Sequence, residues 1–417
     1  MRAVTRREFL RASGAGLASA ALLGVVGCGG QQGGTGGGPI RIGALYPVSG
    51  VLALLGEESF RGADIARRQR NNNGGIAGSE IEYVRADVPE PNVARSEAER
   101  LVSQERLQLL IGTYSSTLAL TASEVAARRG VNYFELGAIS DEFTDRGYDT
   151  VYRTNPPARE FAASQVRFIE EWLASQLGKK PSEFRLAIAH EDSDYGTSVA
   201  QDIRNEADPV GLNIVSVEPY DAEASDLTPV VLRVKKSNPD TVIAVSYAQD
   251  AILLSRQAQQ QDLGAPIFGT GGGHSLQTFI DTVGEAGDGV FNVDFTQYEV
   301  NKQFTPGLQE FVDSYKQAYD SDPKSGHSLA NFFGANIVFD ILEEAKGSLE
   351  SDRVGKAVNA YTVKQGTTAT GWGVDFDENG QNTSAQPFVM QWRDGNLVTV
   401  YPEEAAVMEP KLVGSSG

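Results

Sequence analysis

Residues 109–117 read LLIGTYSST, an apolar run that passes into small hydroxyl residues. The apolar run predicts a buried strand, and the periodicity that follows predicts a helix over residues 117–129. A strand that ends where a helix begins gathers free backbone N–H groups and the positive end of the helix dipole, which suit a ligand carboxylate. The same serines also suit a plain helix N-cap, so the segment alone leaves both interpretations open.

The same order of strand and helix extends in both directions from this segment. Short runs rich in β-branched residues alternate with longer segments of helical periodicity, which is typical of parallel sheets covered by helices on both faces. The expected strands are 40–45, 81–84, 107–112, 131–134, 184–189, 214–217, 241–246, 267–269, 387–393 and 397–401, and the expected helices are 57–70, 93–104, 117–129, 158–177, 198–206, 227–236, 250–261, 304–318, 328–346 and 352–361.

Two segments are predicted to cross between lobes. Residues 151–157 form an extended run that ends in two prolines, and residues 269–273 read GTGGG, which is too flexible for the interior of a helix or strand. If both segments are crossings, one lobe is discontinuous, and a return of the chain near residue 368 makes the other lobe discontinuous as well. The expected α/β fold therefore has two lobes, each a parallel-rich sheet flanked by helices: lobe I is 39–153 plus 272–367, lobe II is 154–271 plus 368–405, and a tail covers 406–417.

The first 27 residues have the pattern of an export signal, a basic start followed by a short apolar run. Arg6 and Arg7 lie in TRREFL, which resembles the twin-arginine export motif, and VVGC at 25–28 resembles the lipobox of bacterial lipoproteins. We therefore expect residues 1–27 to be the signal, Cys28 to be the site of lipid attachment and residues 28–38 to be a glycine-rich tether. The expected location is extracytoplasmic and anchored to the cell membrane, either in the periplasm or on the outer face of the cytoplasmic membrane.

Composition argues against several classes of function. The chain has 36 basic and 55 acidic side chains and a formal charge of -19, which disfavours binding to nucleic acid. One cysteine and three scattered histidines offer no metal site, and residues 375–380, DFDENG, lack the later glutamate of a calcium loop. No nucleophile elbow or other catalytic motif occurs. We expect no catalytic residue, no metal and no cofactor, so an enzyme is disfavoured.

Two tyrosines follow predicted strands of the second lobe. Tyr195 lies in HEDSDYG at 190–196, and Tyr247 lies directly after the strand 241–246. Aromatic side chains at strand ends can cover an apolar ligand and donate a hydroxyl to it. Either tyrosine could equally be an ordinary core or surface residue.

The order of these motifs resembles the leucine/isoleucine/valine-binding family of bacterial ABC-transporter solute-binding proteins, which have a type I periplasmic-binding-protein fold. The resemblance covers about residues 40–401. It is carried by GALYPVSG at 43–50, NGGI at 73–76, the strand end and serines at 111–116, FTDRGY at 143–148, HEDSDYG at 190–196 and Tyr247.

The resemblance implies a ligand site. The ligand carboxylate would be held at Ser115 and Ser116 and by a small-residue loop at Gly137 and Ile139, with Tyr114 adding aromatic surface. Tyr195 and Tyr247 would cover the ligand from the second lobe.

Two departures from the family concern the ligand. Ile139 stands where amino-acid-binding members carry a threonine, and Gly271 stands where they carry the glutamate that receives the α-ammonium group. A buried ammonium without a carboxylate partner would be costly. Either Glu135, Asp250 or another acid substitutes, or the ligand has no α-amino group.

The resemblance implies a monomeric solute-binding protein that closes its two lobes on a small carboxylate-bearing solute and delivers it to an ABC permease. Branched-chain amino acids are the family's usual ligands, and the departures favour aromatic or other hydrophobic acids. The alternative is a surface sensor that uses the same fold to signal rather than to transport.

Overall fold

The computed structural model describes residues 38–412. The predicted export signal with Arg6 and Arg7, the lipid attachment site Cys28, the tether up to residue 37 and the end of the tail lie outside the described residues. No helix among residues 38–412 is both long enough and apolar enough to cross a membrane.

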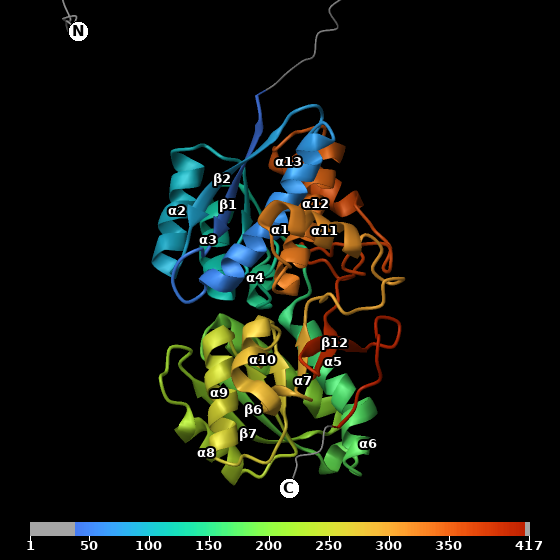
Figure 1. Cartoon of the computed structure of the whole chain (residues 1–417). Helices are drawn as coiled ribbons and strands as arrows, with labels where there is room; N and C mark the ends of the chain where they lie inside the picture. The colour runs from blue at the N-terminus through green and yellow to red at the C-terminus, as the bar shows by residue number, and fades with distance from the viewer. Residues whose placement is uncertain (1–37, 413–417) are drawn as a thin grey trace, which may run out of the picture. The chain divides into compact units, whose positions relative to one another are not determined.

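The described residues contain two sheets, each flanked by helices (Figure 1). The first sheet is entirely parallel and has the order β2-β1-β3-β4-β5. The second has the order β12-β11-β10-β9-β8-β6-β7 and is parallel from β10 to β7, with β11 and β12 antiparallel at one edge. The predicted fold class is confirmed. The strands are β1 (Ile40–Tyr46), β2 (Ile81–Asp87), β3 (Leu109–Gly112), β4 (Asn132–Glu135), β5 (Val151–Arg153), β6 (Arg185–Glu191), β7 (Asn213–Tyr220), β8 (Thr241–Val245), β9 (Ile267–Thr270), β10 (Phe291–Asp294), β11 (Phe388–Arg393) and β12 (Asn396–Tyr401).

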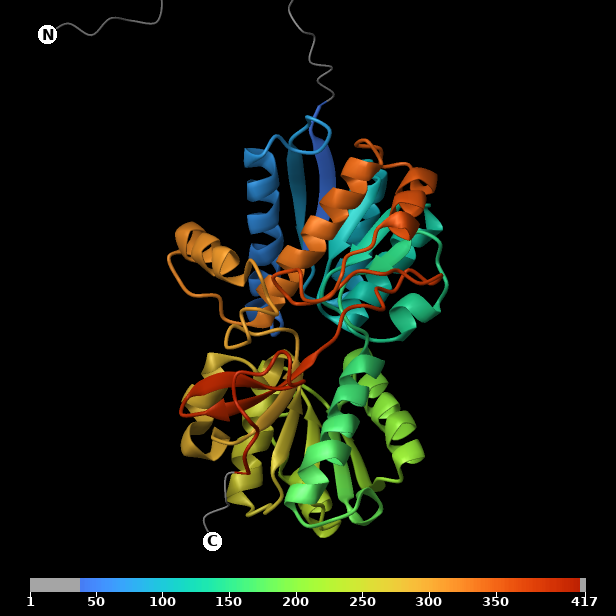
Figure 2. The same cartoon turned by 90° about the vertical axis from the view of Figure 1, so that its right-hand side faces the viewer.

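Helices from distant parts of the sequence cover the first sheet. The early helix α1 packs along the late helix α12, and Figure 2 shows the late helices beside the N-terminal strands. The first lobe is thus built from two separate stretches of chain, as predicted. Its helices are α1 (Ala53–Asn72), α2 (Pro91–Ser103), α3 (Ser116–Arg128), α4 (Glu142–Asp145), α11 (Leu308–Tyr319), α12 (Gly326–Glu344) and α13 (Ser351–Ala360), and those of the second lobe are α5 (Ala158–Phe168), α6 (Ala174–Gln176), α7 (Asp194–Val210), α8 (Thr228–Lys236), α9 (Ala248–Gln260) and α10 (Gln277–Val283).

The predicted crossing at residues 269–273 is wrong. Residues 267–270 are the strand β9, and β10 pairs beside it in the same sheet with Val293 opposite Thr270. The chain therefore stays in the second lobe until after Asp294. The glycines serve close packing instead of flexibility, because a Cβ at Gly273 would overlap the carbonyl oxygen of Tyr247.

The return to the second lobe also comes later than the predicted boundary at 367 and 368. The backbone N–H of Arg153 in β5 donates to Gly380 O at 2.8 Å, and Asn382 N donates to Arg153 O at 2.9 Å. Residues near 380 therefore extend the edge of the first sheet, and the last crossing lies between residue 382 and β11. The remaining lobe limits stay a prediction.

The contact between α1 and α12 gives a stability prediction. A Cβ at Gly62 of α1 would overlap the backbone carbonyl of Ser328 in α12, so Gly62→Ala should force the helices apart. We expect the free energy of unfolding to fall by about 1–3 kcal/mol, although alanine has the higher helix propensity. Chemical denaturation followed by circular dichroism measures the loss.

The matched control for Gly62→Ala is Gly355→Ala in α13. There the nearest atom to a new Cβ is the Tyr152 hydroxyl at 3.3 Å, at the end of a side chain. This variant should stay within about 1 kcal/mol of the wild type. Equal losses for the two variants would contradict the packing argument.

Candidate ligand-binding site

A cavity lies where strands of both sheets end. Its wall contains five aromatic rings, several small residues and one carboxyl group, and it draws on residues that follow β3, β4, β8 and β9 and end β10. Ligands of open α/β sheets bind at such carboxyl ends. The lining residues are Leu55, Tyr114, Ser116, Gly137, Ile139, Phe161, Tyr195, Ser246, Tyr247, Gly271, Gly272, Gly273, Asp294, Phe295 and His327.

The structure brings seven of the eight predicted ligand-binding residues to this cavity. They are Tyr114, Ser116, Gly137, Ile139, Tyr195, Tyr247 and Gly271. Ser115, which stands at the N-cap position of α3, is not in the lining. Their contact with a ligand stays a prediction.

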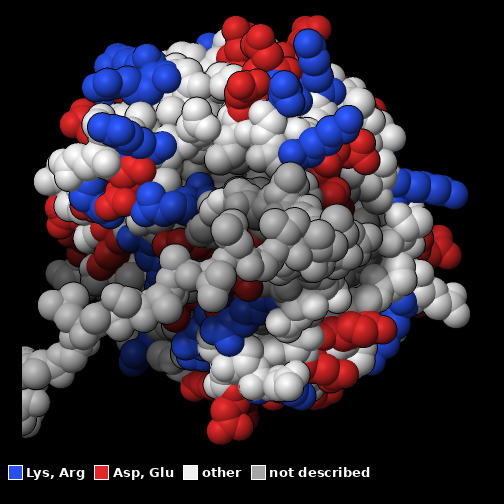
Figure 3. Space-filling view, turned by 90° about the horizontal axis from the view of Figure 1, so that it is seen from above, with Lys and Arg blue, Asp and Glu red and all other residues white. Residues whose placement is uncertain are grey.

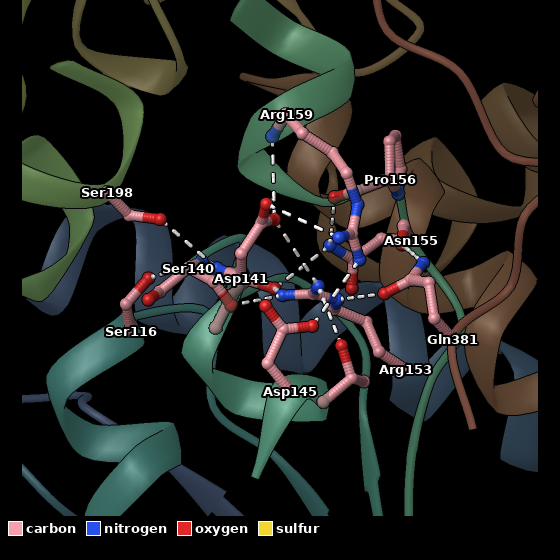
Figure 4. Close-up of polar contacts among 12 residues, drawn as sticks. Ser116, Ser140, Asp141, Asp145, Arg153, Asn155, Pro156, Arg159, Ser198 and Gln381 are labelled. Carbon is pink, nitrogen blue, oxygen red and sulfur yellow. Dashed lines mark hydrogen bonds and ion pairs between the residues drawn. The ribbon is translucent and has the colours of Figure 1, made fainter. Parts of the chain in front are cut away.

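The start of α3 faces this cavity through Ser116. The side chain of Ser115 makes no capping hydrogen bond, so the plain N-cap interpretation does not account for these serines. Ser116 Oγ accepts a hydrogen bond from the backbone N–H of Ser140 at 3.1 Å, which joins α3 to the loop after β4 (Figure 4). The 13-residue helix therefore presents its positive end to the cavity.

Glu135 organises the two loops that form this end of the cavity. Its carboxylate is fully buried and lies outside the cavity lining. Burial raises the pKa of Glu135 to about 7, against the opposing effect of backbone N–H donors. Those donors, which occupy both oxygens, are Thr113, Tyr114, Leu136, Gly137 and Ala138. Glu135 is thus a structural anchor and does not face a ligand.

The second predicted acid, Asp250, also lies outside the lining. It accepts a hydrogen bond from Tyr220 Oη at 3.0 Å, and burial raises its pKa to about 8. Asp294, which the sequence analysis did not single out, is the carboxyl group that does line the cavity. Burial raises the pKa of Asp294 to about 7.

Tyr195 and Tyr247 form one aromatic wall, with their ring centroids 5.3 Å apart. Tyr195 Oη donates to Thr270 O at 2.7 Å, which fixes the ring over the end of β9. On the opposite side, the Tyr114 ring meets His327 edge to face at 5.6 Å. Burial lowers the pKa of His327 to about 3, so this imidazole is neutral.

The sequence analysis missed several lining residues. Phe161 and His327 lie in the helices α5 and α12, where their sequence positions mark them only as core residues. Phe295 and Asp294 lie at the end of the short segment 290–295, VFNVDF, and the strand β10 within it was not predicted.

Hydrogen bonds join the two lobes beside the cavity. Thr117 Oγ1 in α3 donates to Asp194 Oδ2 in α7 at 2.7 Å. The backbone N–H of Asp141 donates to Ser198 Oγ, also in α7, at 3.1 Å (Figure 4). The two lobes are therefore in direct contact beside the cavity.

A sequence profile of the periplasmic binding protein family matches residues 39–396. The chain belongs to this family. Within it, the chain is 44% identical over 375 residues to the Leu/Ile/Val-binding protein homologue 7 of Brucella suis biovar 1, covering 89% of this chain and 94% of that protein. It is also 44% identical over 375 residues to homologue 8 of Brucella abortus, covering 89% and 93%. The resemblance to the leucine/isoleucine/valine-binding family is confirmed.

Solved structures of periplasmic binding proteins share the fold. The leucine-binding protein LivK of Thermotoga maritima has a TM-score of 0.75 at 21% identity, covering 86% of this chain and 97% of that one. LivJ of Streptococcus pneumoniae in complex with isoleucine has a TM-score of 0.73 at 23% identity, covering 89% and 100%. A solute-binding protein of Rhodopseudomonas palustris in complex with benzoate has a TM-score of 0.73 at 18% identity, covering 91% and 99%.

Charged side chains of both signs are interspersed over the described part of the upper face of this periplasmic binding protein (Figure 3). Arg85 forms an ion pair with Glu57, and Arg67 and Arg68 form ion pairs with Asp64, on and beside α1. The Arg85–Glu57 pair is exposed, and such a pair contributes little to stability. Larger electrostatic effects lie with the buried carboxyl groups.

Those buried carboxyl groups predict how stability depends on pH. The pKa values of Glu135, Asp202 and Asp294 are raised to about 7 and that of Asp250 to about 8, all mainly by burial. From about pH 5.5 to pH 8 these four carboxyl groups bind more protons in the native state than in the unfolded state. They outweigh His274 and His327, whose pKa values burial lowers to about 3 and which act in the opposite direction, so the free energy of unfolding falls as pH rises over this range. We expect Tm at pH 5.5 to exceed Tm at pH 8 by at least about 4 °C.

Scanning calorimetry at constant ionic strength measures this pH dependence. Asp294→Asn should reduce the fall in Tm between pH 5.5 and pH 8. The substitution removes one of the groups whose pKa differs between the native and unfolded states. A Tm that increases from pH 5.5 to pH 8 would contradict the prediction.

Proposed function

We propose that the chain is the extracytoplasmic solute-binding lipoprotein of an ABC importer, and that it binds a small hydrophobic amino acid or a related carboxylate by closure of its two lobes. The observation that carries the proposal is the cavity, which both lobes line and which combines five aromatic rings with the start of α3. The relatives named for Leu/Ile/Val binding and the structures that hold isoleucine or benzoate support this class of ligand.

The ligand would bind with its carboxylate at the start of α3, near Ser116 and the loop at Gly137 and Ile139. Backbone N–H groups and the helix dipole would stabilise the negative charge there. Tyr195 and Tyr247 would cover the apolar part from the second lobe. Because a ligand touches both lobes only when they are together, it would favour the closed arrangement over the open one.

The remaining parts of the proposal concern regions outside the cavity. Arg6 and Arg7 would direct export, and Cys28 would carry the lipid that holds the protein at the membrane surface. The glycine-rich stretch of residues 28–38 would act as a tether that lets the lobes reach the permease. The protein would act as a monomer with no cofactor and no catalytic step.

A thermal-shift screen tests the proposal, with branched-chain and aromatic amino acids, acidic amino acids, benzoate-type acids, urea and short amides. A ligand at 100 times its dissociation constant adds about 2.7 kcal/mol to the free energy of unfolding, which shifts Tm by several degrees. We expect stabilisation by at least one hydrophobic carboxylate. Silence of every compound in the panel would contradict the proposal.

Two tryptophan variants locate the binding that the screen detects. Ile139→Trp would fill the cavity and should abolish the ligand-induced shift. Leu232→Trp in α8 adds the same side chain at a position 48% exposed and outside the cavity lining, so the shift should remain. A shift that survives Ile139→Trp would place the ligand elsewhere.

A further inference from the structure

Gly271, the position at which the resemblance implies an ammonium-binding glutamate, disfavours any side chain in this structure. Gly271 has a φ of 73°, in the left-handed region that disfavours other residues. A Cβ there would lie 2.5 Å from Tyr195 Oη, which is held by its hydrogen bond to Thr270 O. A glutamate at residue 271 would therefore displace the tyrosine wall of the cavity.

A carboxyl group lies one strand away from this position. β10 runs parallel to β9 with Val293 opposite Thr270, and the backbone N–H of Gly271 donates to Val293 O at 2.7 Å. Asp294, the next residue of β10, is thus the neighbour of Gly271 across the sheet. It lines the same cavity, whereas Glu135 and Asp250 do not.

The surroundings of Asp294 supply hydrogen bonds but no positive charge. Its oxygens accept from Ser275 Oγ at 2.6 Å, Gln297 Nε2 at 3.1 Å and the backbone N–H of Phe295 at 2.8 Å, and the side chain is fully buried. Among residues 38–412, no Lys or Arg lines the cavity and none forms an ion pair with Asp294.

The titratable groups around Asp294 leave it without a cationic partner. Tyr195 of α7 and Tyr298 after β10 have pKa values raised well above 10, and His327 of α12 is neutral. A buried carboxylate without a cation is costly, and burial accordingly raises the pKa of Asp294 to about 7. A cation brought by the ligand would remove this cost.

We propose that Asp294 receives the α-ammonium group of the ligand, so that the ligand is a hydrophobic α-amino acid bound as a zwitterion. The inference rests on the proposed function and narrows it. The ligand carboxylate would lie at the start of α3 and its ammonium group at the end of β10, with the side chain among the aromatic rings. An acid without an amino group would add its carboxylate charge to that of Asp294. It would bring no cation to balance the Asp294 carboxylate or its own.

Calorimetric titration with matched ligand pairs tests this inference. L-Leucine is compared with 4-methylpentanoate and L-phenylalanine with 3-phenylpropanoate, because each pair differs only in the amino group. We expect the wild type to bind at least one amino acid about 100-fold more tightly than its partner acid. Asp294→Asn should lower amino-acid affinity by about 100-fold and leave or improve the affinity for the partner acid.

Asp250→Asn is the matched control, because it neutralises another buried carboxyl group of the second lobe that lies outside the cavity lining. Its amino-acid affinity should stay within a few-fold of the wild type. Loss of amino-acid binding in Asp250→Asn but not in Asp294→Asn would overturn the inference.

The wild type alone supplies an independent readout if Asp294→Asn does not fold. Asp294 must lose its proton to hold an ammonium group, so at pH 6 amino-acid binding should release close to one proton, measured as the difference in heat between two buffers. The affinity should therefore rise from pH 5.5 to pH 8. The partner acids should release no proton.

The outcomes separate this inference from the proposed function. Tighter binding of the partner acids than of the amino acids, or amino-acid binding without proton release at pH 6, would overturn the role of Asp294 and leave solute binding intact. Failure of the wild type to bind any compound in the panel would overturn the proposed function itself.

Discussion

Arg153→Met should lower the free energy of unfolding by about 3–5 kcal/mol, because it removes a buried charge from a network built around it. The guanidinium is fully buried and remains protonated at neutral pH, since burial lowers its pKa only to about 10. Its Nε donates to Gln381 Oε1 at 2.5 Å and its Nη1 to Ser140 O at 2.6 Å (Figure 4). Methionine would leave Gln381 Oε1 buried without this donor, and Ser140 O would keep only the hydrogen bond from the backbone N–H of Phe143.

The same substitution should weaken ligand binding. Ser140 follows Ile139 in the cavity wall and its backbone N–H bonds Ser116, so Arg153 holds the loop that faces the ligand. The next residue, Asp141, bonds Ser198 of the second lobe. We expect lower affinity in calorimetric titrations at a temperature where the variant is still folded.

Arg159→Met provides the control for Arg153→Met. Figure 4 shows Arg159 beside the same cluster, but its side chain is 41% exposed and its contacts with Asp141 and Asp145 are both 3.7 Å. Such a pair contributes less than about 1 kcal/mol. If Arg153→Met lowers the free energy of unfolding no more than Arg159→Met does, the buried network around Arg153 does not stabilise this part of the protein.

Glu135→Gln should lower the free energy of unfolding at pH 8 by at least about 1–3 kcal/mol and also reduce ligand affinity. An amide nitrogen cannot accept a hydrogen bond. If it replaces Oε2 it faces the backbone N–H of Thr113, which lies 2.6 Å from that oxygen, and if it replaces Oε1 it faces four backbone N–H groups. Either orientation leaves a buried donor unpaired and disturbs the loops at Tyr114 and Gly137.

Glu82→Gln in β2 makes the same chemical change at a half-exposed position of the same sheet. Its ion pair with Arg41 is long and exposed, so the stability should change by less than about 0.5 kcal/mol. Denaturant titrations of both variants give the comparison. Similar small effects would contradict the anchoring role of Glu135.

The strands near the N-terminus and the position of the serines beside a helix start were predictable from local patterns. The run LLIGTYSST contains a buried strand and the start of the following helix within nine residues. The end of the strand and the start of the helix are therefore close together. Tyr195 and Tyr247 were predictable for the same reason. The family resemblance then selected among positions that the patterns alone left open.

The crossings and Asp294 depend on contacts between distant segments. The glycines at 271–273 were interpreted as part of a crossing between lobes. Glycine is needed there because Tyr195 and Tyr247 approach the backbone closely, and no local pattern reveals these contacts. The strand β10 has four residues, two of them polar, and it is recognisable only by its pairing with β9 and β11. Missing that strand also hid the carboxyl group at its end.

A crystal structure of the chain grown with the compound that stabilises it most would test the central claim most directly. The account predicts ligand density in the cavity between α3 and the tyrosine wall, with a carboxylate oxygen about 3 Å from backbone N–H groups at the start of α3 and the apolar part against Tyr195 and Tyr247. An empty cavity with the ligand bound elsewhere, or a ligand whose carboxylate points away from α3, would contradict it.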